Sequence, residues 1–293
     1  MKEASFYRRL EDKNVVCELC PNNCFIPEGF TGWCGVRHNK KGKLYSLNYE
    51  KPVAIAIDPV EKKPLKFFHS GEKILSIGTY GCNLHCKNCQ NFGISQAEYF
   101  KDKIKYTKTV SAKEIIKRTK EAGLKLIAFT YNEPTIFYEY MIEIAKLAKK
   151  AKIKTVLVSN GMIAEEPLKE LLPYLDAANI DVKSFKNSFY KEVSSSLAIA
   201  PILTLKNTLK TLFEAGVHLE LTHLVIPDYS SKQEVDEICK WVKNELSSEV
   251  PIHLSRFFPY YKMNNKPATD IKFLKELEKT AKKHLKKVIM GNV

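Results

Sequence analysis

Three cysteines stand close together in the stretch GTYGCNLHCKNCQN, which follows the apolar run KILSI. Cys82, Cys86 and Cys89 form the pattern Cys-x3-Cys-x2-Cys, a spacing that lets one folded loop bring several thiolates to a metal centre. Three thiolates leave a structural zinc site one ligand short, whereas an iron–sulfur cube held by three thiolates keeps one iron open. The loop therefore favours an iron–sulfur cluster. The alternative is a zinc loop completed by His85 or by a distant residue.

A second group of cysteines lies near the amino terminus, in the stretch CELCPNNCFIPEGFTGWC. Four thiols are enough to close a structural zinc site or to hold a second iron–sulfur cluster, and the sequence leaves both metals open. These four ligands are Cys17, Cys20, Cys24 and Cys34. The remaining cysteine, Cys239, lies among apolar residues at helical spacing, and we expect it to fill the core.

Composition limits the setting in which these cysteines act. Of the 293 residues 44% are hydrophobic, as in a packed globular protein, and the first thirty residues contain no apolar segment typical of a signal peptide. No apolar run is long enough to span a bilayer. We therefore expect a cytoplasmic protein without a membrane partner, where clustered thiols serve as metal ligands rather than disulfides. The formal net charge of +14 could attract nucleic acid, but the basic residues are spread along the chain.

From Lys73 onward, short β-rich runs alternate with amphipathic helical segments. The predicted strands cover residues 73–78, 124–130, 153–159, 176–183, 217–226 and 251–257. The predicted helices lie near residues 111–122, 134–151, 165–173, 201–215, 231–247 and 270–286. This repeat predicts an α/β fold, a partial (β/α)6 TIM-type barrel, with a doubly wound sheet as the alternative. We expect an N-terminal cysteine-rich module and β-rich connector at residues 1–72, followed by the barrel at 73–293.

Ligand sites of such folds lie at the carboxyl ends of the parallel strands, and motifs occur at these positions. The three-cysteine loop follows the first strand, YNEP the second, SNG the third and DVK the fourth. This order resembles the radical SAM enzymes over residues 73–291. Together with the amino-terminal cysteines and the stretch HLSRFFPYYKM, it resembles the radical SAM proteins of the AmmeMemoRadiSam system, which are similar to pyruvate formate-lyase-activating enzymes.

The resemblance implies an oxidoreductase whose three-cysteine loop, Cys82, Cys86 and Cys89, holds a [4Fe-4S] cluster. In that family the open iron binds the amino and carboxylate groups of S-adenosylmethionine (SAM). Reductive cleavage of SAM then yields a 5′-deoxyadenosyl radical that abstracts hydrogen from a substrate. The resemblance also implies an electron donor such as flavodoxin or ferredoxin as a partner.

The motifs after the second and third strands are implied to contact SAM. Glu133 brings a negative charge toward the methionine ammonium, and Asn132 stands in the same motif, where relatives carry glycine. Ser159 and Asn160 resemble a Thr-Asn-Gly turn of the family. They either contact the nucleoside or cap the turn.

The later strands supply the remaining candidates. Asp181 and Lys183 alternate with an apolar residue, so they point to one side of the strand. The resemblance assigns them to the ribose hydroxyls and the methionine carboxylate. His253 and Arg256 are candidates for the adenine end of SAM or for the substrate. A histidine in an apolar strand is more often a core residue, and Arg256 could equally hold an anionic substrate.

The substrate remains open between three hypotheses. The first is activation of a glycyl radical enzyme, whose glycine loop would enter the barrel. The second is radical modification of a small molecule or of another protein, including operon-encoded partners. The third, from another class, is a zinc-containing nucleic-acid-binding protein. The basic residues form no aromatic-interleaved stripe, and that hypothesis leaves the three-cysteine loop unexplained, so we expect nucleic acid to be no partner.

Overall fold

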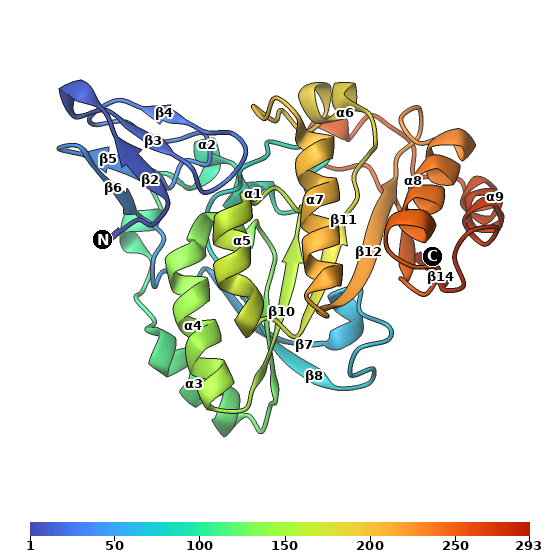
Figure 1. The fold of residues 1–293 in the computed structure, drawn as a ribbon, viewed down its shortest axis with the longest axis horizontal. Helices are drawn as coiled ribbons and strands as arrows, with labels where there is room; N and C mark the ends of the chain where they lie inside the picture. Colours follow the sequence, from blue (N-terminus) through green and yellow to red (C-terminus); the bar gives the residue numbers. More distant parts are fainter.

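The computed structural model describes residues 1–293 and is built around one eight-stranded sheet (Figure 1). Seven neighbouring strands follow the order of the chain and run parallel. They are β8 (Lys73–Gly78), β9 (Leu126–Phe129), β10 (Lys154–Ser159), β11 (Ala177–Asp181), β12 (His218–Val225), β13 (Ile252–Arg256) and β14 (Val288–Gly291). The eighth strand, β7 (Ala54–Pro59), pairs antiparallel with β8 at one edge.

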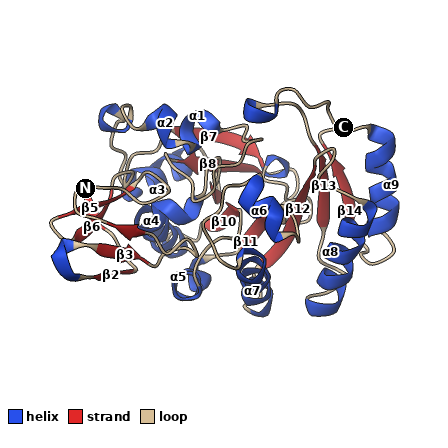
Figure 2. Ribbon diagram, turned by 90° about the horizontal axis from the view of Figure 1, so that it is seen from above, coloured by secondary structure: helices blue, strands red, loops and turns tan.

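Long helices connect the parallel strands and lie along one side of the curved sheet, as the view from above shows (Figure 2). They are α3 (Ala112–Glu121), α4 (Tyr138–Lys150), α5 (Glu165–Leu171), α7 (Pro201–Glu214), α8 (Lys232–Glu245) and α9 (Ile271–Ala281). A doubly wound sheet requires a point at which the strand order reverses, and this sheet has none. The edge strands β7 and β14 do not pair, so the predicted open, partial barrel is confirmed.

The sheet contains one parallel strand more than the six that the sequence predicted. Strand β14 consists of four half-buried residues, and the predicted helix over 270–286 ends earlier, at Ala281. A short strand that is only half buried lacks the continuous apolar pattern that marks the central strands.

Local signals in the sequence explain where the helices begin. Ser111 and Ser231 cap α3 and α8, because each hydroxyl accepts a hydrogen bond from a backbone N–H three residues later. Asp270 caps α9 in the same manner through its carboxylate. The central strands are buried on both faces, as expected of a parallel sheet covered by helices. No helix combines the length and the apolar character needed to cross a membrane.

The amino-terminal residues form two small three-stranded antiparallel sheets. One contains β2 (Tyr7–Arg9), β3 (Val15–Cys17) and β4 (Phe25–Ile26), and the other β1 (Lys2–Glu3), β5 (Arg37–Lys40) and β6 (Lys43–Ser46). Their buried residues belong to the same continuous hydrophobic core as those of the barrel. The module therefore packs on the barrel, beside α4 and the α2 turn (Ala97–Phe100) (Figure 1). The division at residue 72 stays a prediction, and its β-rich connector contains β7.

Candidate active site

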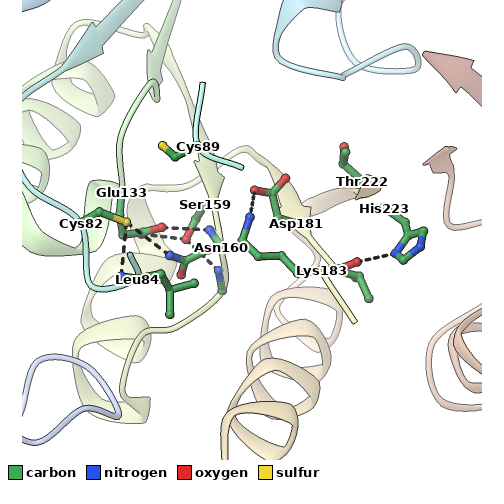
Figure 3. A network of polar contacts seen from close by, with 12 residues as sticks. Cys82, Leu84, Cys89, Glu133, Ser159, Asn160, Asp181, Lys183, Thr222 and His223 are labelled. Atoms are coloured by element: carbon green, nitrogen blue, oxygen red, sulfur yellow. Dashed lines mark hydrogen bonds and ion pairs between the residues drawn. The ribbon is translucent and has the colours of Figure 1, made fainter. Parts of the chain in front are cut away.

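A cavity of ≈ 490 Å³ opens at the carboxyl ends of the parallel strands. All three cysteines of the first loop line it, together with polar residues that follow the next strands. From the predicted set, the lining residues are Cys82, Cys86, Cys89, Asn132, Glu133, Ser159, Asn160, Asp181 and Lys183. Side chains that lie as far as 101 positions apart in the sequence, 183 − 82, thus meet in one place (Figure 3).

The cysteine loop is held from several sides. The Asn132 side chain accepts a hydrogen bond from Thr79 N at 3.0 Å and donates one to Gly81 O at 2.8 Å. Gly81 has a φ of +97°, and a Cβ at this position would lie 2.8 Å from the carbonyl oxygen of Cys34. Only glycine fits this position without displacing its neighbours. Asn132 therefore positions the loop, and since it also lines the cavity, its contact with SAM stays a prediction.

Hydrogen-bonding groups lie close to two of the three sulfur atoms. The backbone N–H of Leu84 donates to Cys82 Sγ at 3.4 Å, and Asn160 Nδ2 lies 3.9 Å from the same sulfur (Figure 3). Cys89 Sγ and Ser95 Oγ are 3.2 Å apart. Burial raises the pKa of the Cys82 and Cys89 thiols. A bound metal lowers the pKa of a thiol, because a coordinating thiol loses its proton. The hydrogen-bonding groups can then stabilise the negative sulfur of a metal-bound thiolate.

The number of thiols favours a cluster over a single structural ion. Three thiols of the first loop line the cavity, one fewer than a closed structural zinc site takes. In an iron–sulfur cube each thiolate binds a different iron, so three thiolates leave one iron open. His85 does not complete a zinc site, because its ring stacks on Trp33 at 4.2 Å and its Nε2 lies 3.1 Å from Trp33 O. The donor set therefore fits a [4Fe-4S] cluster.

Glu133 is the centre of a buried hydrogen-bond network. Its Oε1 accepts from Thr135 N at 3.0 Å, Thr135 Oγ1 at 2.7 Å and Ser159 Oγ at 2.8 Å. Its Oε2 accepts only one, from Asn160 N at 2.9 Å. Burial raises the pKa of Glu133, while these donors oppose that shift. A carboxylate oxygen has room for more than one donor, so Oε2 can accept a further hydrogen bond from a ligand in the cavity.

Asp181 at the end of β11 and Lys183 two residues later form an ion pair, with 2.9 Å between Oδ2 and Nζ (Figure 3). Although burial by itself lowers the pKa of Lys183, the Asp181 carboxylate raises it above its ordinary value. Lys183 therefore stays a cation beside the cysteine loop. The pair presents one positive and one negative group to the same cavity.

The last two candidates lie apart from the cavity. His253 is three residues before the end of β13, and its Nε2 lies 2.7 Å from Glu220 Oε2, away from the carboxyl end of the sheet. Arg256 donates from Nε to Thr269 O at 2.8 Å, and its guanidinium covers the Phe258 ring. The structure gives His253 the role of a core residue with a polar partner, and it gives Arg256 a role in fixing the following loop.

Two groups of site residues were not predicted from the sequence. Asn83 accepts a hydrogen bond from Asn160 Nδ2 at 2.8 Å and donates one to Met162 O at 2.7 Å, which ties the cysteine loop to β10. Its place directly after Cys82 was the available signal. Deeper in the cavity, Asp58 Oδ2 accepts from Lys63 Nζ at 2.8 Å and from Tyr131 Oη at 2.6 Å. No local sequence motif predicts these contacts of Asp58.

Comparison with known proteins agrees with this geometry. The profile of the Radical SAM superfamily matches residues 76–242, more than half of the chain. The chain belongs to the radical SAM superfamily. A protein of Methanocaldococcus jannaschii named "Uncharacterized protein" is 38% identical over 297 residues, covering 100% of this chain and 86% of the relative. A second M. jannaschii protein, named "Putative glycyl-radical enzyme activating enzyme", is 23% identical over 214 residues. The match covers 73% of this chain and 79% of that relative.

Solved structures show the same fold at low sequence identity. A radical SAM methyltransferase from Sphaerobacter thermophilus has a TM-score of 0.57 and 14% identity, with 76% of this chain and 67% of that chain covered. Streptococcus suis SuiB bound to S-adenosylmethionine has a TM-score of 0.55 and 15% identity, with 74% and 51% covered. At this identity the likeness concerns the fold. The chain is thus a radical SAM enzyme, and its family implies a [4Fe-4S] cluster and SAM.

Proposed function

We propose that Cys82, Cys86 and Cys89 hold the [4Fe-4S] cluster and that SAM binds in the cavity beside them. The observation that carries the proposal is that the three thiols, the Glu133 network and the Asp181–Lys183 pair line one cavity. When bound, the cluster would supply the electron that cleaves SAM and produces the 5′-deoxyadenosyl radical for hydrogen abstraction.

The side chains divide the recognition of SAM by charge. Glu133 Oε2, with its single donor, accepts a hydrogen bond from the methionine ammonium. Lys183 attracts the methionine carboxylate, and Asp181 accepts hydrogen bonds from ribose hydroxyls. Ser159 and Asn160 orient Glu133, since both donate to its carboxylate. The residues bind and orient the reactants and exclude water, while the cofactors supply the difficult chemistry.

For the substrate, we propose a glycyl radical enzyme, whose glycine loop would enter the open barrel. The names of the relatives support this class: besides the M. jannaschii protein, the 4-hydroxyphenylacetate decarboxylase activating enzyme of Clostridium scatologenes is 24% identical over 205 residues, which cover 66% of this chain. A protein substrate needs a site that a flexible segment can reach. The cavity at the carboxyl ends of the strands is the place where such a segment would enter.

The first experiment tests the SAM chemistry. The protein is reconstituted with iron and sulfide without oxygen, reduced with dithionite and mixed with SAM, and 5′-deoxyadenosine is quantified. We expect product from the parent protein and none from Cys86→Ala, which also loses iron, while Cys239→Ala serves as a thiol control outside the site. Equal product from the parent and Cys86→Ala would contradict the proposal.

A second experiment tests the substrate. The reduced protein and SAM are mixed with a glycyl radical enzyme encoded in the same genome, and electron paramagnetic resonance (EPR) is recorded. The glycyl radical signal in the partner is the expected result. Production of 5′-deoxyadenosine without that signal, for every such partner, would remove the activase proposal while leaving the SAM chemistry intact.

A further inference from the structure

A small cavity between the amino-terminal module and the barrel is bordered by four thiols. Its volume is ≈ 10 Å³, about the space of one water-sized sphere. The thiols belong to Cys17, Cys20, Cys24 and Cys34, and no disulfide joins any of them. The rest of the lining includes the apolar side chains of Leu19 and Ile136. A space of this size suits one ion.

A buried arginine lines the same cavity and lacks acceptors. Arg37 is 1% exposed, and its only side-chain hydrogen bond runs from Nη1 to Glu139 Oε1 at 2.8 Å. Its Nε and Nη2 have no partner. Burying unpaired donors of a charged group is costly, so such donors normally face an acceptor. Metal-bound thiolates are strong acceptors, and the four thiols are the groups that share this cavity with the guanidinium.

We propose that Cys17, Cys20, Cys24 and Cys34 bind one structural zinc ion, with Arg37 donating hydrogen bonds to the thiolates. Four protein thiolates close the tetrahedral shell that structural zinc prefers. The thiols border the cavity without yet forming a group placed to hold an ion, so we infer that binding draws the two loops inward. Binding replaces the thiol protons by the ion and releases those protons to solvent.

The proposed zinc site lies beside the loop of Cys82, Cys86 and Cys89. Asn83, the neighbour of Cys82, lines the zinc cavity, and its carbonyl oxygen accepts a hydrogen bond from Asn22 Nδ2 at 2.8 Å. Asn22 also accepts one from Leu197 N at 3.1 Å. Zinc would therefore fix the loop of residues 17–24 against the cysteine loop of the barrel.

Metal analysis of cysteine variants tests the proposal. The triple variant Cys82→Ala, Cys86→Ala, Cys89→Ala removes the ligands of the catalytic cluster, and we expect it to retain about one zinc per chain. Cys20→Ala with Cys34→Ala should lose that zinc, and Cys239→Ala should retain it. A triple variant that contains no zinc, or that holds iron at this site, would overturn the proposal. Because the triple variant cannot hold the catalytic cluster, this result is independent of the proposed SAM chemistry.

A second measurement uses the folded triple variant and does not depend on the folding of the zinc-site variants. Cobalt added in place of zinc should give the visible absorption bands of a tetrahedral thiolate site, and their absence would also overturn the proposal. In the triple variant, Arg37→Met should weaken zinc affinity by about 10- to 100-fold in competition with a chelator. Arg8→Met, at an exposed arginine, should leave the affinity unchanged. Equal affinities for the two variants would refute the role of Arg37.

Discussion

Replacing Glu133 by glutamine tests how the cavity recognises SAM. The substitution keeps the size of the side chain and removes its negative charge. A hydrogen bond to a charged group contributes about 1.5–3 kcal/mol, and the neutral amide offers the methionine ammonium only a weaker acceptor. Since about 1.4 kcal/mol corresponds to a factor of ten, the affinity for SAM should fall by about 10- to 100-fold.

The network also predicts a loss of stability. Four donors contact the Glu133 carboxylate, whose two oxygens only accept, whereas the amide NH₂ of glutamine donates. Either orientation of the glutamine amide places its NH₂ against at least one donor, the backbone N–H of Asn160 or the donors from Thr135 and Ser159. An unsatisfied buried donor costs about 1–3 kcal/mol, so the unfolding free energy should decrease by a similar amount.

Glu234 provides a matched control for this substitution. It is also 2% exposed, and it accepts hydrogen bonds from Ser184 and Phe185, but it does not line the cavity. Equilibrium dialysis of reconstituted protein without oxygen measures the SAM affinity, and urea titration measures stability. Glu234→Gln should lose stability and retain SAM affinity, whereas Glu133→Gln should lose both. Unchanged SAM affinity in Glu133→Gln would refute the assignment of this carboxylate.

Three further predictions follow from other contacts. Lys183→Met should raise the SAM concentration needed for half-maximal 5′-deoxyadenosine formation by about tenfold or more. Lys186→Met, at an exposed lysine, should leave that concentration unchanged. Equal values for the two variants would contradict the role of Lys183. Gly81→Ala should reduce iron content after reconstitution, because its Cβ would lie 2.8 Å from Cys34 O; unchanged iron would show that the loop adapts. Although burial raises the pKa of Glu220, hydrogen bonds from His218 and His253 and from two backbone amides lower it to about 2 from its ordinary 4.5. That stabilisation, at most about 3 kcal/mol, is present above pH 4.5 and lost as the pH falls toward 2, so the stability difference between the parent and Glu220→Gln in urea titrations should shrink over this range; a constant difference would contradict it.

The sequence predicted the barrel because its central strands carry strong local signals. The strand Lys73–Gly78 coincides with the predicted range, and strands β9 to β13 lie within theirs. Residues that follow buried parallel strands meet at one edge of the sheet, so the predicted cysteines, Glu133 and Asp181 share a cavity. Here periodicity and topology together were enough to bring distant residues into one site.

The remaining features depend on contacts that no local pattern reveals. The pairing of Asp58 with Tyr131 joins the connector strand to the turn after β9, 73 positions away along the chain. The amide of Asn132 holds Thr79 and Gly81 of the cysteine loop, a contact that its motif did not predict. His253 occupied a plausible strand, but its position before the carboxyl end directs it to Glu220. Which partner a polar side chain finds is decided by tertiary packing.

We propose that three thiolates leave one iron of the cluster for SAM. Electron–nuclear double resonance of the reduced, reconstituted protein with SAM labelled by ¹⁵N at the amino group measures this contact directly. We expect a coupling between the cluster and the labelled nitrogen in the parent protein and in Glu234→Gln. Absence of that coupling in a protein that binds SAM, with a fully occupied cluster, would contradict it.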